Sequence, residues 1–144
     1  MVSLLRAALL VLFLVPLAHS TQAQEVVEPA VQEKVRAIIT AQVEAFRRDD
    51  VATAFSFASP SIQQQFRSPD VFATMVKGSY AAVYRPRSFD FRRLLKIEGT
   101  YYQEVAFVGA ELQTLLCIYQ MMEMPDGSWR INGVFAGQGK EQAT

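Results

Sequence analysis

Residues 88–136 read SFDFRRLLKIEGTYYQEVAFVGAELQTLLCIYQMMEMPDGSWRINGVFA, and their pattern decides the fold. In the first run, apolar residues alternate with polar ones: Phe89, Phe91, Leu95 and Ile97 with Ser88, Asp90, Arg92 and Lys96. In the last run, the alternation is of Trp129, Ile131 and Phe135 with Arg130 and Asn132. Turn signals at 98–100, 109–110 and 125–127 divide the stretch into four runs. Four strands with short connections predict an antiparallel meander.

The segment before Pro86 has a longer apolar period, which is typical of helices. One side of the first predicted helix, which follows Pro29, carries Val31, Val35, Ile38, Gln42 and Phe46. Further helix starts are indicated at Asp49 or Asp50, at Ser59-Pro60 and at Ser68-Pro69-Asp70. Helices grouped before strands predict an α+β domain in which the helices pack on one face of the sheet.

The first 23 residues have the features of a signal peptide. Arg6 supplies a positive start, and the apolar run over 7–18 is shorter than the roughly 20 residues that a membrane-spanning helix needs. Small residues favour cleavage after Ser20 or after Ala23, and a polar lead follows over 24–29. We therefore expect an exported protein, periplasmic or secreted, without a stable membrane anchor.

Residue chemistry excludes several classes of active site. His19, the only histidine, lies in the segment that we expect to be removed, so no imidazole remains for a catalytic triad, a Cys-His pair or a His-based zinc site. Cys117 is the single cysteine, and its apolar neighbours predict a buried small hydrophobe. The 14 basic and 14 acidic residues balance, which argues against nucleic-acid binding. We assign no cofactor, no metal ligand and no catalytic residue.

Two stretches carry a resemblance to a known superfamily. ITAQVEAFRRDDVATAFSFASPSIQQQF (39–66) and PDGSWRINGV (125–134) are similar to the front helices and the final hairpin of the nuclear transport factor 2-like superfamily. The front stretch also resembles a bacterial exported family of unassigned function within it. The resemblance implies a single cone-shaped, cystatin-like α+β domain over 30–136, with N-terminal helices packed on a bent four-stranded antiparallel sheet. Residues 137–144 would then form a flexible tail.

Such a fold would enclose a pocket between the helices and the sheet. We expect a non-enzymatic site that binds a small apolar ligand or a partner protein there. The candidate ligand-binding residues are Phe46, Phe55, Met75, Tyr80, Tyr84, Asp90, Tyr119 and Trp129. The alternative is that these side chains fill the space completely, since aromatic and methionine side chains at regular spacing usually form a core.

Two other functions remain open. A proton-transfer enzyme, an isomerase or a hydratase, would need Asp90 buried beside a tyrosine, which would raise the pKa of its carboxyl. The other reading of Asp90 is a solvated carboxylate that balances Arg92. A homodimer through the sheet is the third function, since sheets in the resembled superfamily often pair face to face. Leu116, Ile118 and Met122 would supply an apolar face for that contact.

Overall fold

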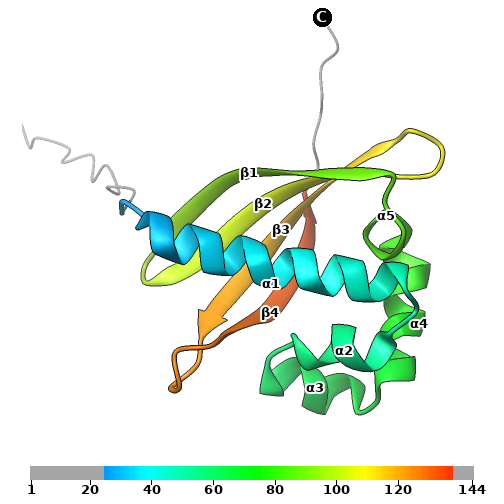
Figure 1. The fold of residues 1–144 in the computed structure, drawn as a ribbon, viewed down its shortest axis with the longest axis horizontal. Coiled ribbons are helices and arrows are strands. Elements are labelled where there is room, and N and C mark those ends of the chain that lie inside the picture. The colour runs from blue at the N-terminus through cyan, green and yellow to red at the C-terminus, as the bar shows by residue number, and fades with distance from the viewer. Residues whose placement is uncertain (1–24, 138–144) are drawn as a thin grey trace, which may run out of the picture.

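The computed structural model describes residues 25–137, in which five helices precede a four-stranded sheet (Figure 1). The helices are α1 (Pro29–Arg47), α2 (Val51–Ser56), α3 (Pro60–Phe66), α4 (Pro69–Ser79) and α5 (Ala81–Tyr84). The strands are β1 (Ser88–Ile97), β2 (Thr100–Val108), β3 (Thr114–Glu123) and β4 (Trp129–Gly137). The α+β prediction is confirmed. The predicted leader with its cleavage sites and residues 138–144 lie outside the described residues.

The predicted helix starts are confirmed by side-chain caps. Asp50 accepts a hydrogen bond from the Thr53 amide at 3.2 Å, and it opens α2. The Ser59 and Ser68 hydroxyls accept from the third amide beyond them, at 3.3 and 3.2 Å, and each precedes a proline. These caps fix the residue at which each helix begins, because each cap satisfies a backbone amide that has no partner within the helix.

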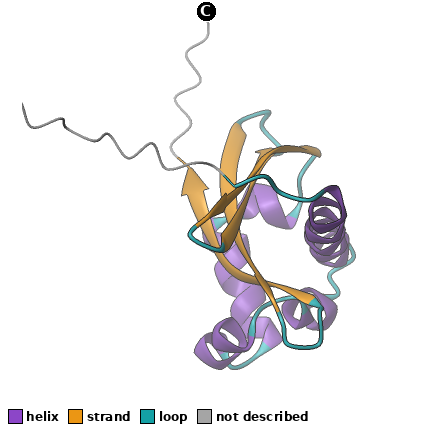
Figure 2. Cartoon of the chain, turned by 90° about the vertical axis from the view of Figure 1, so that its left-hand side faces the viewer, coloured by secondary structure: helices purple, strands orange, loops and turns teal. Residues whose placement is uncertain are grey.

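The strands pair in chain order, β1-β2-β3-β4, and every pairing is antiparallel. Gly99 and Gly127 adopt left-handed φ angles of 78° and 81° in two of the turns, a region that suits glycine. α1 crosses one face of the curved sheet, and the smaller helices follow it on the same side (Figures 1 and 2). The meander predicted from the turn signals is therefore correct.

The simple alternation predicted for β1 is wrong beyond Phe91. The register with β2 shifts between Phe91 and Leu94, where a bulge inserts one extra residue. Leu94 consequently packs on the core, whereas Ile97 is 43% exposed. Leu95 and Ile97 were expected on the same face as Phe91, and a one-residue shift moves both to the other face.

A second irregularity corrects the prediction for β4. Its register with β3 shifts between Met121 and Gln120, so that Asn132 is the extra residue. Trp129 and Ile131 are buried as expected, but Phe135 is 53% exposed on the other face, opposite Ile118. Gly137 belongs to β4, so the strand ends one residue later than the expected domain boundary at 136.

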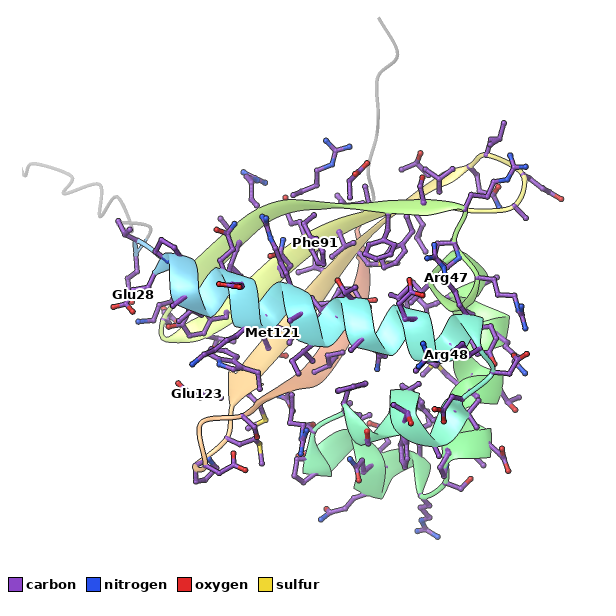
Figure 3. The ribbon with its side chains drawn as sticks, in the orientation of Figure 1. Glu28, Arg47, Arg48, Phe91, Met121 and Glu123 are labelled. Carbon is purple, nitrogen blue, oxygen red and sulfur yellow. The ribbon has the colours of Figure 1, made fainter. Side chains whose placement is uncertain are left out.

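The core lies between α1 and the inner face of the sheet. The buried stripe of α1 includes Val35, Ile39, Val43 and Phe46, which belong to the same core cluster as Val105, Phe107, Cys117 and Tyr119 of β2 and β3. Figure 3 labels Phe91, which lies between β1 and α1, where the Arg36 guanidinium stands 5.2 Å from the ring centroid. This packing fixes α1 against the sheet, and the smaller helices lie together at one end of the domain.

Candidate functional site

A cavity of about 350 Å³ lies between α1, α3 and α4 on one side and β3 and β4 on the other. Its lining from the helical side includes Gln42, Phe46, Ile62, Phe66, Phe72, Met75, Val76 and Tyr80. The sheet contributes Tyr119 and the segment 131–135. The sequence did not decide whether side chains fill this space. In the structure, the space between the lining side chains is unfilled. Within residues 25–137, its lining holds no Asp, Glu, Lys, Arg, His or Cys.

Four of the eight candidate residues meet at this cavity. Phe46, Met75, Tyr80 and Tyr119 line it, from α1, α4, the α4–α5 junction and β3. Each was placed on an inward face by the period of its segment, and these faces converge. The remaining four, Phe55, Tyr84, Asp90 and Trp129, lie elsewhere.

An aromatic cluster forms the wall of the cavity at α1 and α4. Phe46 is 1% exposed, and its ring centroid lies 6.0 Å from Phe72 and 5.0 Å from Tyr84. Phe55 contacts Phe72 at 5.2 Å between centroids, and it is not among the lining residues. Phe55 therefore supports the wall from a second layer.

Trp129 packs away from the cavity. Its indole is buried and meets the Tyr101 ring edge to face, with 5.1 Å between centroids. The Lys96 ammonium lies 5.5 Å from the same tyrosine ring and 2.6 Å from the Glu25 carboxylate. Trp129 thus belongs to the core and does not line the candidate site.

Tyr84 faces a second, more open hollow of about 530 Å³ at the other side of α5. Its hydroxyl donates to the Asp49 carboxylate at 2.8 Å, and Arg85 donates to the same carboxylate at 2.6 Å. The hydrogen bond from Tyr84, followed by that from Arg85, lowers the pKa of Asp49. Asp49 has a left-handed φ of 56°, at the corner after α1. This triad ties that corner to α5, which is a structural role.

Asp90 does not reach the cavity. It is exposed on β1, where its register partner is Ala106. The expectation of a carboxylate inside the pocket is therefore wrong, and Asp90 matches the alternative reading, a solvated carboxylate. A proton-transfer site built on Asp90 and a tyrosine has no geometric basis in the described part of the chain.

Three polar cavity residues, Gln42, Gln65 and Asn132, were missed as site candidates. Gln42 is buried, and its amide nitrogen donates to the Ala54 carbonyl at 3.1 Å. Asn132 accepts from the Ser59 hydroxyl at 2.8 Å through its side-chain oxygen. A signal for Gln42 was present, because a polar residue interrupts the apolar stripe of α1. Asn132 gave none, since the bulge that turns it toward the cavity has no local mark.

The two tyrosine hydroxyls at the cavity are in different situations. Tyr80 donates to the Val134 carbonyl at 3.2 Å. The Tyr119 side chain is fully buried, and its hydroxyl has no hydrogen-bond partner among residues 25–137. Burial raises the pKa of Tyr119 well above its ordinary value, so that the hydroxyl stays protonated. The lining of the cavity therefore includes one tyrosine whose buried, neutral hydroxyl is an unused donor.

Cys117 is fully buried next to this site, as predicted for a small hydrophobe. Burial raises the pKa of its thiol to about 12, which disfavours the reactive thiolate. Among residues 25–137, no cluster of three His, Cys, Asp or Glu side chains could hold a metal ion. In the same range, no helix has the length and apolar character to cross a membrane.

Comparison with known proteins identifies one family model. The model described as "Domain of unknown function (DUF4864)" matches residues 28–144. The match begins one residue before α1 and includes every helix and strand described above. No curated protein and no solved structure matches the chain.

Proposed function

The chain belongs to the DUF4864 family, and we propose that it binds a small apolar molecule in the cavity between its helices and its sheet. The open volume of about 350 Å³ carries this proposal. Cavities that bind small molecules are of this order or larger, mostly apolar, and contain a few polar groups. Residues 25–137 place no carboxylate, imidazole or thiol at the wall, which favours binding over chemistry.

Thermal unfolding with a panel of uncharged lipophiles tests the binding. A ligand present at about 100 times its Kd stabilises the fold by about 2.7 kcal/mol, which raises Tm by several degrees. Met75→Trp should abolish the shift, because Met75 lines the cavity from α4 and the larger ring would occupy it. Uniformly unchanged Tm values across the panel would contradict the proposal.

The matched control is Val71→Trp on the same helix. Val71 is exposed and is not among the lining residues, so the same new side chain should point to solvent there. We expect Val71→Trp to keep the full ligand-induced shift. If both variants lost it equally, the cavity would not be the binding site.

Two further proposals concern relationship and location. We propose that the family is a branch of the nuclear transport factor 2-like superfamily; the order of helices and strands, the curved sheet and the cavity between helices and sheet support this. We also propose export to the periplasm or the exterior, supported by the pattern of residues 1–23. Fractionation of the producing cells, with N-terminal sequencing of the recovered chain, checks the second point; a chain that stays inside the cells and keeps Met1 would contradict it.

A homodimer through the sheet is the second candidate function. The face of the sheet opposite the helices presents Ile118 on β3 beside the exposed Phe135 of β4, with Leu116 and Met122 on the same face of β3. Side chains of this kind on adjacent strands form an apolar surface that a second copy could cover by two-fold symmetry. Two observations support the dimer: this face of the sheet is apolar, and no helix of the described chain covers it.

Sedimentation at micromolar concentration tests the dimer. We expect a dimer for the wild type and a monomer for Leu116→Lys, because the register partners Ala106 and Gly137 carry no charge and the ammonium would be buried in the contact without a partner. Ala52→Lys, on an exposed position of α2, is the control and should sediment as the wild type. A wild-type monomer at this concentration would exclude the proposal.

A further inference from the structure

We infer that the cavity selects uncharged molecules that carry one hydrogen-bond acceptor, and that the Tyr119 hydroxyl is the donor that recognises this acceptor. The inference rests on the proposed binding function and names the class of ligand. It stands on three features of the cavity: an unused buried donor, the hydrogen bonds that already engage three neighbouring polar residues, and the absence of charge within the described lining.

The unused donor is the hydroxyl of Tyr119. The side chain is fully buried and lines the cavity, and its oxygen has no partner among residues 25–137. Folded proteins rarely leave a buried polar group unpaired, because such a group loses its bonds to water and gains none. An acceptor inside the cavity would remove this deficit. A ligand carbonyl, ether or hydroxyl oxygen has the required lone pair.

Three of the neighbouring polar residues are already hydrogen-bonded, and Gln65, a further polar lining residue, is exposed to solvent. The Tyr80 hydroxyl donates to Val134, the Gln42 amide nitrogen donates to Ala54, and the Asn132 side-chain oxygen accepts from Ser59. These bonds orient side chains that line the cavity and reduce their competition for a ligand. Tyr119 is left as the one lining side chain whose hydroxyl is both fully buried and unpaired in the described chain.

The wall also discriminates against charge. No Asp, Glu, Lys, Arg or His side chain lines the cavity within residues 25–137. An ionised ligand group would lose its hydration there without gaining a counter-ion, which is costly in an apolar site. The hydroxyl of Tyr119 alone offers an anion one hydrogen bond, whereas protein sites for carboxylates usually supply a cation or several donors. Neutral molecules are therefore favoured over carboxylates of the same shape.

Matched pairs of ligands test this selectivity by calorimetry. The pairs are fluorene with fluorenone, bibenzyl with deoxybenzoin, and cyclododecane with cyclododecanone; in each the second compound adds one carbonyl. We expect the ketone to bind about tenfold more tightly than its hydrocarbon, the value of one net hydrogen bond. Fluorene-9-carboxylate should bind at least about 100-fold more weakly than fluorenone.

Tyr119→Phe and Tyr80→Phe are the matched variants. Tyr119→Phe should bring the ketone-to-hydrocarbon affinity ratio to one or below, because the ketone oxygen is then buried without its donor, and it should leave hydrocarbon affinity unchanged. Tyr80→Phe should keep the ratio near tenfold, because its hydroxyl already bonds Val134. Without ligand, Tyr119→Phe should melt a few degrees higher than the wild type, and Tyr80→Phe lower.

The outcomes separate this inference from the proposed function. If no member of any pair binds, the binding function fails, and the inference fails with it. If ketone and hydrocarbon bind equally to the wild type, binding stands, and the Tyr119 hydroxyl serves a bound water instead. If the preference exists but survives in Tyr119→Phe, another group recognises the carbonyl. Either of the last two results overturns the inference alone.

Discussion

Gln103→Leu is expected to lower the free energy of unfolding by about 2–4 kcal/mol and Tm by about 10 °C. Gln103 is fully buried on β2, at the level of the bulge in β1. Its amide nitrogen lies 3.1 and 3.2 Å from the Arg92 and Arg93 carbonyl oxygens, and 2.8 Å from that of Glu104. A bulge leaves backbone groups outside the ladder, and this amide supplies their donor. Leucine has a similar size but cannot donate.

Chemical denaturation measures this loss, and Gln120→Leu is the control. Gln120 lies on β3 and is half-buried on the opposite face of the sheet. A change there should remain within about 0.5 kcal/mol of the wild type. The buried Gln103 side-chain oxygen has no partner within residues 25–137, so its removal offsets part of the cost. A Gln103→Leu protein as stable as the wild type would show that the bulge does not need the amide.

The bulge also shows which features could not be predicted from the sequence. Ser59, Ser68 and Asp50 act on amides three residues away, so their helix starts could be predicted from local chemistry. The carbonyl groups at the bulge in β1 accept hydrogen bonds from Gln103, a residue of another strand. Strict alternation was the simplest interpretation of the β1 pattern, and it placed Leu95 and Ile97 on the wrong face. Contacts between strands decide such a shift.

The same distinction applies to the candidate site: local patterns predicted some of its residues, whereas contacts between distant segments decided the place of others. Phe46 and Tyr119 were predicted correctly as cavity residues, because the period of a helix or strand determines which side faces inward. Phe55 and Trp129 also face inward, yet they pack behind the wall, and only the arrangement of whole elements distinguishes these two places. Whether a volume stays open depends on the fit between distant segments, and no pattern within one segment contains that information.

Phe46→Ala is expected to cost about 3–5 kcal/mol, the largest loss for a single substitution at this site. Phe46 is almost completely buried, and its ring contacts those of Phe72 and Tyr84. Alanine would remove these contacts and add the volume of the ring to a cavity that is already present. The surroundings should not collapse into this space, since α1 is fixed by its packing on the sheet. Thermal unfolding measures the change.

Val71→Ala provides the comparison at an exposed position outside the cavity lining, and it should change the stability by less than about 1 kcal/mol. A loss of stability below that value for Phe46→Ala would mean that the aromatic wall does not support the cavity.

Ligand binding distinguishes the role of the aromatic wall from that of the Tyr119 hydroxyl. Phe46→Ala retains the Tyr119 hydroxyl, so it should still prefer ketones to hydrocarbons while accepting larger molecules. Tyr119→Phe should do the opposite, which would assign size selection to the aromatic wall and polarity selection to one hydroxyl.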